Sequence, residues 1–168
     1  MKIRTAAFTD KGRVLEIYAL AKSGMKANGI DQWQDGYPNA ESFESDVHEG
    51  ISLICEEEGN IIATAAAYIG HEQTYDEIHQ GRWLTDNNEY GIIHRIAVDP
   101  LARKSGVASC VIEYVRSLCI ESSVTSMRCD THRDNAIMQH TLEKNGYKFC
   151  GIIYLENGDE RFGYEKLV

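Results

Sequence analysis

A short stretch in the middle of the chain combines the residue types that can hold a phosphate group. Residues 102–108 read ARKSGVA, so two cations, a glycine and small residues directly precede an amphipathic run. The first N–H groups of a helix have no partner within the helix, and the aligned peptide dipoles add partial positive charge there. Glycine at position 106 would also let a ligand approach the backbone closely. The stretch matches neither the GxxxxGK[ST] phosphate loop nor the three-glycine dinucleotide motif, so it predicts either an anion site or an ordinary helix start.

Two elements must position this stretch, a strand before it and a helix after it. Residues 91–98, GIIHRIAV, form the near-continuous β-branched run of a central strand that is covered on both faces. The run stops at Asp99–Pro100, because proline cannot donate to a strand ladder. Beyond the stretch, apolar residues from Val107 to Cys119 recur at helical spacing, so the sequence predicts strand, loop and helix in direct succession.

The other residues continue one series of helices and strands without an internal repeat. Asp10 is expected to cap the first helix, and Asp134 or Thr131 the last. Residues 71–90 lack steady periodicity, and a loop of this length inside a domain is usually functional or mobile. The order β-α-α-β-β-β-α-β-α-β-β is typical of an α+β fold with helices on the sheet faces. We expect strands at residues 2–8, 51–57, 61–70, 91–98, 124–132, 147–155 and 161–168, and helices near residues 11–26, 39–50, 107–119 and 135–146.

Length and composition limit the class of protein. The chain has 168 residues, enough for one self-sufficient core, so we expect a single domain over residues 1–168. A net charge of -9 argues against binding to nucleic acid or to an anionic membrane. No apolar run is long enough to span a bilayer and no secretory signal is evident, so the cytoplasm is the expected location. The five cysteines include no C-x-x-C pair and no His/Cys cluster, which predicts reduced thiols and no metal site.

The sequence around the stretch resembles a known coenzyme-binding motif. Residues 93–108, IHRIAVDPLARKSGVA, are similar to the acetyl-CoA-binding motif of the GNAT superfamily of N-acyltransferases, an apolar strand ending in V-x-P followed by R/Q-x-x-G-x-G/A. Arg103, Gly106 and Ala108 fill the three loop positions. Residues 134–147, DNAIMQHTLEKNGY, resemble the second half of the family pattern at Asn135, Lys144, Gly146 and Tyr147. The resemblance covers essentially the whole chain and implies the family's α+β fold, with a mixed, mostly antiparallel sheet and helices on both faces.

The resemblance also implies a coenzyme and its position. Acetyl-CoA would bind and coenzyme A would leave as product. In the family the central strand splays from its neighbour, here residues 124–132, and leaves a V-shaped slot in which the backbone of Ile96, Ala97 and Val98 would pair with the pantetheine arm. Asn135 would contact the same arm or the sulfur end. The pyrophosphate would lie on the backbone N–H groups of Lys104, Ser105, Gly106, Val107, Ala108 and Ser109, with Arg103 at the entrance.

Acetyl transfer to an amine requires a proton acceptor, and His94 is the leading candidate. An alkylamine with a pKa of about 10.4 is almost fully protonated at neutral pH, so forming the neutral, nucleophilic amine costs roughly 4–5 kcal/mol. The reference pKa of an imidazole, about 6.5, suits the task, and some superfamily members that acetylate arylalkylamines carry a histidine at this position. A backbone N–H of Ile96 or Ala97 would stabilise the developing oxyanion. The alternatives are that His94 is a strand histidine hydrogen-bonded into the interior, or that a carboxylate acts through water, with Asp76, Glu77 and Glu89 as the candidates.

The chain departs from the family pattern at Leu142, where many members place a tyrosine that protonates the coenzyme thiolate. A thiol with a pKa near ~8.5 can take its proton from water, so this loss should weaken catalysis less than the loss of a base. Tyr147 is nearby in sequence, and a packed position in the core is expected for it. Arg95 should point to the opposite face of a regular strand from the preceding histidine and act as a structural partner of Asp99 or Asp130.

Aromatic and acidic side chains gather in two irregular segments that would border the slot. Such a wall suits a cation or an aromatic amine. We therefore expect transfer of an acetyl group from acetyl-CoA directly to a primary amine of a small molecule. A non-catalytic CoA sensor and a protein or peptide N-acetyltransferase are the alternatives, and the oligomeric state is open, with a homodimer among the expected assemblies. The residues expected to contact the substrate are Trp33, Tyr37, Tyr75, Glu77 and Trp83.

Overall fold

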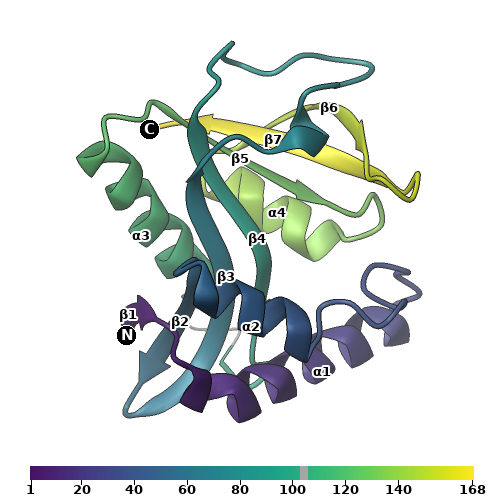
Figure 1. The fold of residues 1–168 in the computed structure, drawn as a ribbon. Coiled ribbons are helices and arrows are strands. Elements are labelled where there is room, and N and C mark those ends of the chain that lie inside the picture. Colours follow the sequence, from purple (N-terminus) through teal and green to yellow (C-terminus); the bar gives the residue numbers. More distant parts are fainter. Residues whose placement is uncertain (103–105) are drawn as a thin grey trace. The chain divides into compact units, whose positions relative to one another are not determined.

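The computed structural model of the chain describes residues 1–102 and 106–168 (Figure 1). Strands and α-helices follow one another in these residues in the order expected from the sequence pattern. The strands are β1 (Lys2–Thr5), β2 (Ser52–Glu57), β3 (Asn60–Gly70), β4 (Tyr90–Val98), β5 (Ser126–Thr131), β6 (Lys148–Tyr154) and β7 (Glu160–Leu167). The α-helices are α1 (Lys11–Ala27), α2 (Ala40–His48), α3 (Val107–Glu121) and α4 (Ala136–Lys144), and short 3-10 turns lie at Phe8–Asp10 and Gln73–Tyr75.

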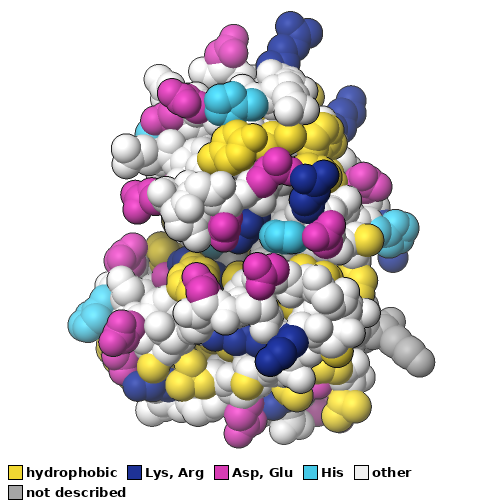
Figure 2. Space-filling view, turned by 90° about the vertical axis from the view of Figure 1, so that its right-hand side faces the viewer, with side chains coloured by type: hydrophobic (Ala, Val, Ile, Leu, Met, Phe, Trp, Pro, Cys, Tyr) yellow, Lys and Arg dark blue, Asp and Glu magenta, His cyan; other side chains and the backbone are white. Residues whose placement is uncertain are grey.

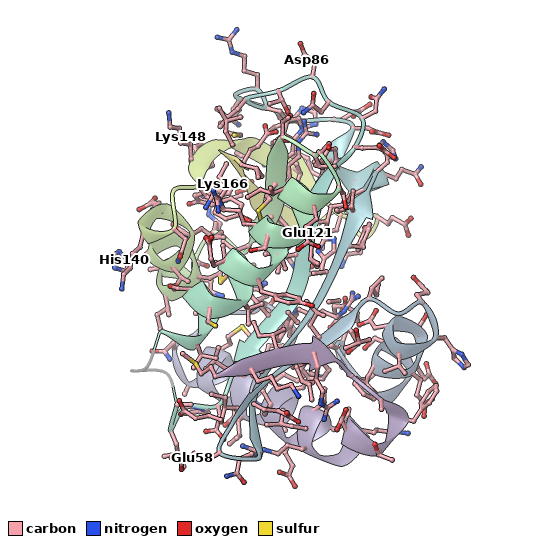
Figure 3. All side chains as sticks on the ribbon, turned by 90° about the vertical axis from the view of Figure 1, so that its left-hand side faces the viewer. Glu58, Asp86, Glu121, His140, Lys148 and Lys166 are labelled. Atoms are coloured by element: carbon pink, nitrogen blue, oxygen red, sulfur yellow. The ribbon has the colours of Figure 1, made fainter. Side chains whose placement is uncertain are left out.

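The strands form a seven-stranded sheet in the order β1-β2-β3-β4-β5-β7-β6. β1 pairs antiparallel with β2, β2 with β3, β5 with β7 and β6 with β7, whereas β4 and β5 run parallel. The β2–β3 hairpin turns at Glu58, which is labelled in Figure 3, and Glu58 has a positive φ of 50°. The mixed, mostly antiparallel sheet with its four helices confirms the predicted α+β fold.

Contacts between Cα atoms divide the chain into two compact units. Unit 1 consists of residues 1–67 and 94–114, and unit 2 consists of residues 68–93 and 115–168. Strands β3 and β4 and helix α3 each contribute residues to both units, so neither unit is one continuous piece of the chain. The expectation of a single domain over residues 1–168 stays a prediction.

The core of unit 1 is built from one face of α1 and its neighbours. Val14, Ile17, Tyr18 and Ala21 recur at helical spacing in α1, and all four are buried. They belong to one hydrophobic cluster with the buried residues Ala6, Phe43, Ile54 and Ala97. Ala97 lies on β4, so this cluster fixes the end of the strand that leads to the candidate coenzyme loop.

The start of α1 differs from the sequence expectation in its chemistry. Asp10 does precede the helix, but its side chain makes no capping hydrogen bond to α1. Instead its carboxylate accepts hydrogen bonds from the backbone N–H of Ala7 at 2.8 Å and from the guanidinium of Arg4 at 2.8 and 3.0 Å. The hydrogen bonds from Arg4 are the main cause that lowers the pKa of the Asp10 carboxyl group. The carboxylate therefore stabilises the 3-10 turn and β1 rather than the helix.

Residues 71–89 are irregular but are attached closely to the strands of unit 2. His79 and Ile152 of β6 form an isolated antiparallel bridge, with N–H to C=O distances of 2.7 and 2.8 Å. A Cβ atom added to Gly81 would lie 1.9 Å from the carbonyl oxygen of Cys150, so only glycine fits at this contact. Tyr75, inside the segment, belongs to the buried cluster of unit 2. The sequence alone allowed residues 71–89 to be either a functional or a mobile loop. In the structure this segment is anchored to β6.

Acidic residues outnumber basic ones in the sequence, 26 to 17. Figure 2 shows acidic side chains scattered across the displayed face, in keeping with the net charge of -9. Within residues 1–102 and 106–168, no helix combines the length and the hydropathy needed to cross a membrane.

Candidate active site

The turn after β4 is fixed by a buried aspartate. Asp99 is buried; its backbone N–H donates to the carbonyl of Ile62 at 2.9 Å, and its Oδ1 accepts from the N–H of Leu101 at 2.8 Å. Its Oδ2 accepts a hydrogen bond from Nη2 of Arg13 on α1. Asp99 therefore holds the direction in which the chain leaves β4. The sequence does not reveal this role, although an aspartate before proline is a common turn signal.

Helix α3 begins directly beyond the candidate phosphate loop. Gly106 has a φ of 72°, a conformation that favours glycine, and among the described residues other than its direct neighbours no atom lies within 4 Å of the position a Cβ would take. The N–H of Cys110 donates to the carbonyl of Gly106 at 3.0 Å, and Val107 is buried beneath the first turn. Such a helix start directs its first N–H groups away from the helix body, toward a ligand. Arg103, Lys104 and Ser105 lie outside the described residues, so their part in coenzyme binding stays a prediction.

The strand residues assigned to the pantetheine arm lie at the end of β4. Ala97 is buried in the core of unit 1, and Ile96 and Val98 are half-buried. The β4–β5 register joins Gly91 to Met127 and Ile92 to Arg128, and both of these pairs belong to unit 2. The splayed slot expected from the family resemblance stays a prediction.

The asparagine assigned to the coenzyme caps α4. The Oδ1 atom of Asn135 accepts a hydrogen bond from the N–H of Met138 at 3.1 Å. The expectation that Asp134 or Thr131 caps this helix is wrong, because Asn135 occupies the N-cap position and its side chain reaches the third residue of the helix. A structural role as cap is therefore established for Asn135, and contact with the coenzyme stays a prediction.

His94 is half-buried on β4 and lies near a buried carboxylate. It interacts electrostatically with Asp46 of α2, whose side chain is only 6 % exposed. Burial raises the pKa of Asp46, and Arg95 opposes that change. The position of His94 in unit 1, next to the residues assigned to the coenzyme, is compatible with the predicted role as a base, which stays a prediction.

Arg95 has different partners from those expected. Its guanidinium binds the carboxylate of Asp46 through two contacts, Nε to Oδ2 at 2.9 Å and Nη2 to Oδ1 at 2.6 Å. Nη1 donates to the hydroxyl of Tyr37. The expected pairing with Asp99 or Asp130 is wrong, because Arg13 takes the first aspartate and Tyr75 donates to the second at 2.7 Å. The φ of Arg95 is 53°, which breaks the regular alternation on which the expectation depended.

Two of the aromatic residues predicted to contact substrate pack in unit 2, Tyr75 buried in its core cluster and Trp83 half-buried against that cluster. Burial raises the pKa of Tyr75 well above its ordinary value, which keeps its hydroxyl protonated as a donor to Asp130. Trp83 donates from Nε1 to the carbonyl of Tyr75 at 2.8 Å. The guanidinium of Arg128 lies 4.5 Å from the ring centroid of Trp83 and 4.0 Å from that of Tyr90. These rings therefore already hold a cation of the chain itself, and substrate contact by Tyr75 and Trp83 stays a prediction.

The other predicted substrate residues differ in exposure, and Trp33 is half-buried against the core of unit 1. Tyr37 is 39 % exposed, and Trp33, with a positive φ of 67°, lies edge-on to Tyr18 with 6.2 Å between ring centroids. Glu77 is almost fully exposed and its carboxylate lies 4.0 Å from His79. Trp33 and Tyr37 belong to unit 1 together with His94, whereas Glu77 belongs to unit 2.

The family's usual acid position is filled by an apolar core residue. Leu142 is completely buried in α4. Tyr147 is also buried, as expected for a packed aromatic, and burial raises its pKa well above its ordinary value. Lys166, labelled in Figure 3, places its Nζ atom 5.8 Å from the Tyr147 ring and donates to the carbonyl of Asn145 at 2.8 Å. Within the described residues the Tyr147 hydroxyl has no hydrogen-bond partner.

Removing that hydroxyl provides a test of a packing role. Tyr147→Phe is expected to leave the free energy of unfolding unchanged or to raise it by up to about 1 kcal/mol, because an unpaired buried hydroxyl costs stability. Tyr75→Phe is the matched control and should lower it by about 1–2 kcal/mol, since its hydroxyl donates to Asp130. Urea unfolding measures both variants. A tenfold loss of turnover in Tyr147→Phe would instead assign its hydroxyl to catalysis.

Comparison with known proteins identifies the family and agrees with the fold. The model of the acetyltransferase (GNAT) family matches residues 13–147. A GNAT-family acetyltransferase from Streptococcus agalactiae 2603 has 35% sequence identity, with 99% of this chain and 95% of that chain covered at a TM-score of 0.89. A GNAT-family acetyltransferase from Listeria monocytogenes 4b F2365 has 21% identity, 99% and 94% coverage and a TM-score of 0.74.

A third similar structure contains bound coenzyme A. The PaiA N-acetyltransferase from Thermoplasma acidophilum, solved in complex with coenzyme A, has 12% identity, with 99% of this chain and 98% of that chain covered at a TM-score of 0.74. No curated protein sequence matched the chain. The family model spans most of the chain and the Streptococcus relative covers nearly all of it. This chain therefore belongs to the GNAT family of acetyltransferases.

Proposed function

We propose that this acetyltransferase moves an acetyl group from acetyl-CoA directly to the primary amine of a small molecule. The observation that carries the coenzyme assignment is the succession at the end of β4, where the buried Asp99 directs the chain and α3 begins after Gly106 at a φ of 72°. A helix start of this kind favours a bound anion such as pyrophosphate. The relative solved with coenzyme A has the same fold, and it supports the assignment at the level of the fold.

The proposed mechanism uses groups on β4 and in the loop after it. The pantetheine arm would lie along Ile96, Ala97 and Val98, and a backbone N–H of Ile96 or Ala97 would stabilise the oxyanion that forms at the thioester carbonyl. His94 would accept the amine proton as the nitrogen attacks the thioester carbonyl. The thiolate of coenzyme A would then leave and take its proton from water, which its ordinary pKa of about 8.5 allows. The buried Leu142 agrees with a mechanism that needs no tyrosine acid.

The acceptor class is inferred from the segment that precedes α2. Trp33 and Tyr37 offer aromatic surface there, and Asp31 and Asp35 are exposed carboxylates in the same segment. Aromatic faces and carboxylates favour a cationic amine. Asn135 and the loop residues Arg103, Lys104 and Ser105 complete the proposal as coenzyme contacts. The homodimer and the cytoplasmic location stay predictions.

Release of free thiol from acetyl-CoA tests the function. We expect release with one or more members of a panel of polyamines and arylalkylamines. Release with peptides alone would replace the small-molecule proposal with a peptide N-acetyltransferase. Tight binding of acetyl-CoA without release for any acceptor, amino acids included, would leave a CoA sensor.

A substitution at Gly106 tests the coenzyme position. Gly106→Glu is expected to weaken acetyl-CoA binding by at least about tenfold, because its carboxylate would face the pyrophosphate and like charges in contact are costly. Gly106→Ala imposes the same strain at positive φ without the charge, so it separates the two effects. Isothermal titration calorimetry measures both. Equal affinities for the two variants would show that the pyrophosphate does not lie at this helix start.

A further inference from the structure

Arg95 occupies an unusual place in unit 1. It follows the proposed base, His94, and precedes Ile96, which is assigned to the coenzyme. Its φ of 53° is rare for a residue with a side chain, and such a conformation persists only where the surroundings impose it. The Arg95 side chain makes contacts that can impose it, because its three guanidinium nitrogens bind two residues far away in the sequence.

The first of these contacts is a buried, two-point ion pair. Asp46 is buried, and its carboxylate accepts hydrogen bonds from Nε and Nη2 of Arg95 at 2.9 and 2.6 Å. A guanidinium and a carboxylate joined in this way fix each other's orientation as well as their separation. The pair also cancels the charge of Arg95, so that a cationic amine nearby would not meet an uncompensated positive charge.

The second contact reaches the segment at residues 28–39. Nη1 of Arg95 donates to the hydroxyl of Tyr37, and the guanidinium carbon lies 5.7 Å from the Tyr37 ring centroid. The segment is also attached to α1. Lys22 Nζ donates to the carbonyl of Gly36 at 2.9 Å, Gln34 Nε2 donates to the carbonyl of Lys22 at 3.2 Å, and the ring of Trp33 lies edge-on to Tyr18. Tyr37 thus ties the exposed segment to β4, the strand of the proposed base.

We propose that Arg95 is a positioning residue that sets acceptor specificity: it holds the ring of Tyr37 and the 28–39 segment beside His94 in the geometry that receives a cationic amine. The proposal rests on the proposed function and goes beyond it, because it assigns acceptor selection to a side chain that need not touch the substrate. Its consequence is a separation of kinetic effects. Loosening the tie should weaken acceptor binding and leave coenzyme binding unchanged.

Tyr37→Phe tests the tie without leaving a buried charge unpaired. We expect the KM for the amine to rise about tenfold, as for the loss of one hydrogen bond to a charged partner, with kcat and acetyl-CoA affinity changed less than about twofold. Arg95→Lys keeps the charge but loses the two-point geometry, and should raise the same KM by at least as much. Tyr154→Phe is the matched control, because Tyr154 is similarly exposed and lies on β6 in unit 2.

Hydrogen exchange followed by mass spectrometry gives a second readout that needs no acceptor. Residues 28–39 should exchange faster in Tyr37→Phe than in the wild type, and Tyr154→Phe should match the wild type there. If amines are acetylated but neither KM nor exchange changes in Tyr37→Phe, the positioning role is wrong and the proposed function stands. Faster exchange with an unchanged KM would also overturn it, since the tie would then be structural only. If no amine is acetylated, the proposed function and the role of Arg95 in acceptor selection are both wrong. Faster exchange of residues 28–39 in Tyr37→Phe would then show only that the Arg95–Tyr37 hydrogen bond holds this segment.

Discussion

Glu165→Ala is expected to lower the free energy of unfolding by about 3–5 kcal/mol, the largest stability effect of any substitution considered for this chain. Glu165 of β7 and Arg128 of β5 have side chains that are 0 % and 5 % exposed, and Arg128 Nε lies 3.3 Å from Glu165 Oε1. This contact is ionic rather than a hydrogen bond, because Nε of Arg128 has no hydrogen-bond partner in the described part of the chain. Removal of the glutamate would leave the guanidinium buried without a counter-charge.

Glu165 also holds the end of the irregular segment of unit 2. Its Oε2 accepts from the N–H of Leu84 at 2.5 Å and of Thr85 at 3.3 Å, and its Oε1 accepts from the Thr85 hydroxyl at 2.6 Å. Arg128 donates to the carbonyl of Thr85 at 2.8 Å. The alanine variant would leave these groups without their acceptor, which adds to the cost.

A glutamate at the other end of the same strand provides the control. Glu160 pairs with Arg133 at 3.2 Å, but the Arg133 side chain is 58% exposed. Glu160→Ala should therefore cost no more than about 1 kcal/mol, because the cationic partner of the pair is largely exposed to solvent and is not left as a buried charge. Urea unfolding monitored by far-UV circular dichroism compares the two variants. Equal losses of stability would mean that the Arg128–Glu165 pair does not anchor the segment.

Local sequence patterns were sufficient to predict the order of the elements. The β-branched run at residues 91–98, the helical stripe after Val107 and the two strands expected at 51–57 and 61–70 each lie within a short window, and each forms the expected element. The same holds for the start of the helix after Gly106, because Gly106 and the following turn are adjacent in the chain. Local patterns therefore predicted the elements that flank the candidate loop, whereas phosphate binding at this helix start stays a prediction.

Side-chain pairing over long separations could not be predicted in this way. Arg95 was expected to follow strand alternation, but its φ is positive and its partner Asp46 lies on a helix 49 residues earlier. The aromatic residues at positions 75 and 83 have the composition of a ligand pocket, yet their faces are packed against Tyr90 and Arg128. Composition cannot distinguish an aromatic cage for a ligand from one filled by the chain's own arginine.

The largest kinetic effect is expected at His94. His94→Ala should lower kcat for amine acetylation by about 10²–10⁴-fold near neutral pH, the usual contribution of a positioned base. Deprotonating an alkylammonium at pH 7 costs roughly 4–5 kcal/mol, and without a base in the site the neutral amine becomes more abundant only when the pH is raised. The rate of the variant should therefore rise about tenfold for each pH unit as the neutral amine accumulates, whereas the wild type should depend less steeply on pH.

The control for this prediction is another histidine of the chain. His140 is exposed on α4 (Figure 3), so His140→Ala should retain wild-type turnover at every pH. His94→Gln keeps the approximate size of the side chain but not its basicity, and should be as slow as His94→Ala if proton transfer is the role that is lost. Recovery of activity in His94→Gln would instead assign His94 to hydrogen bonding near Asp46. Full turnover in both His94 variants would transfer the role of base to a carboxylate acting through water, with Glu77 as the first candidate, because it is exposed and so able to exchange protons with the solvent.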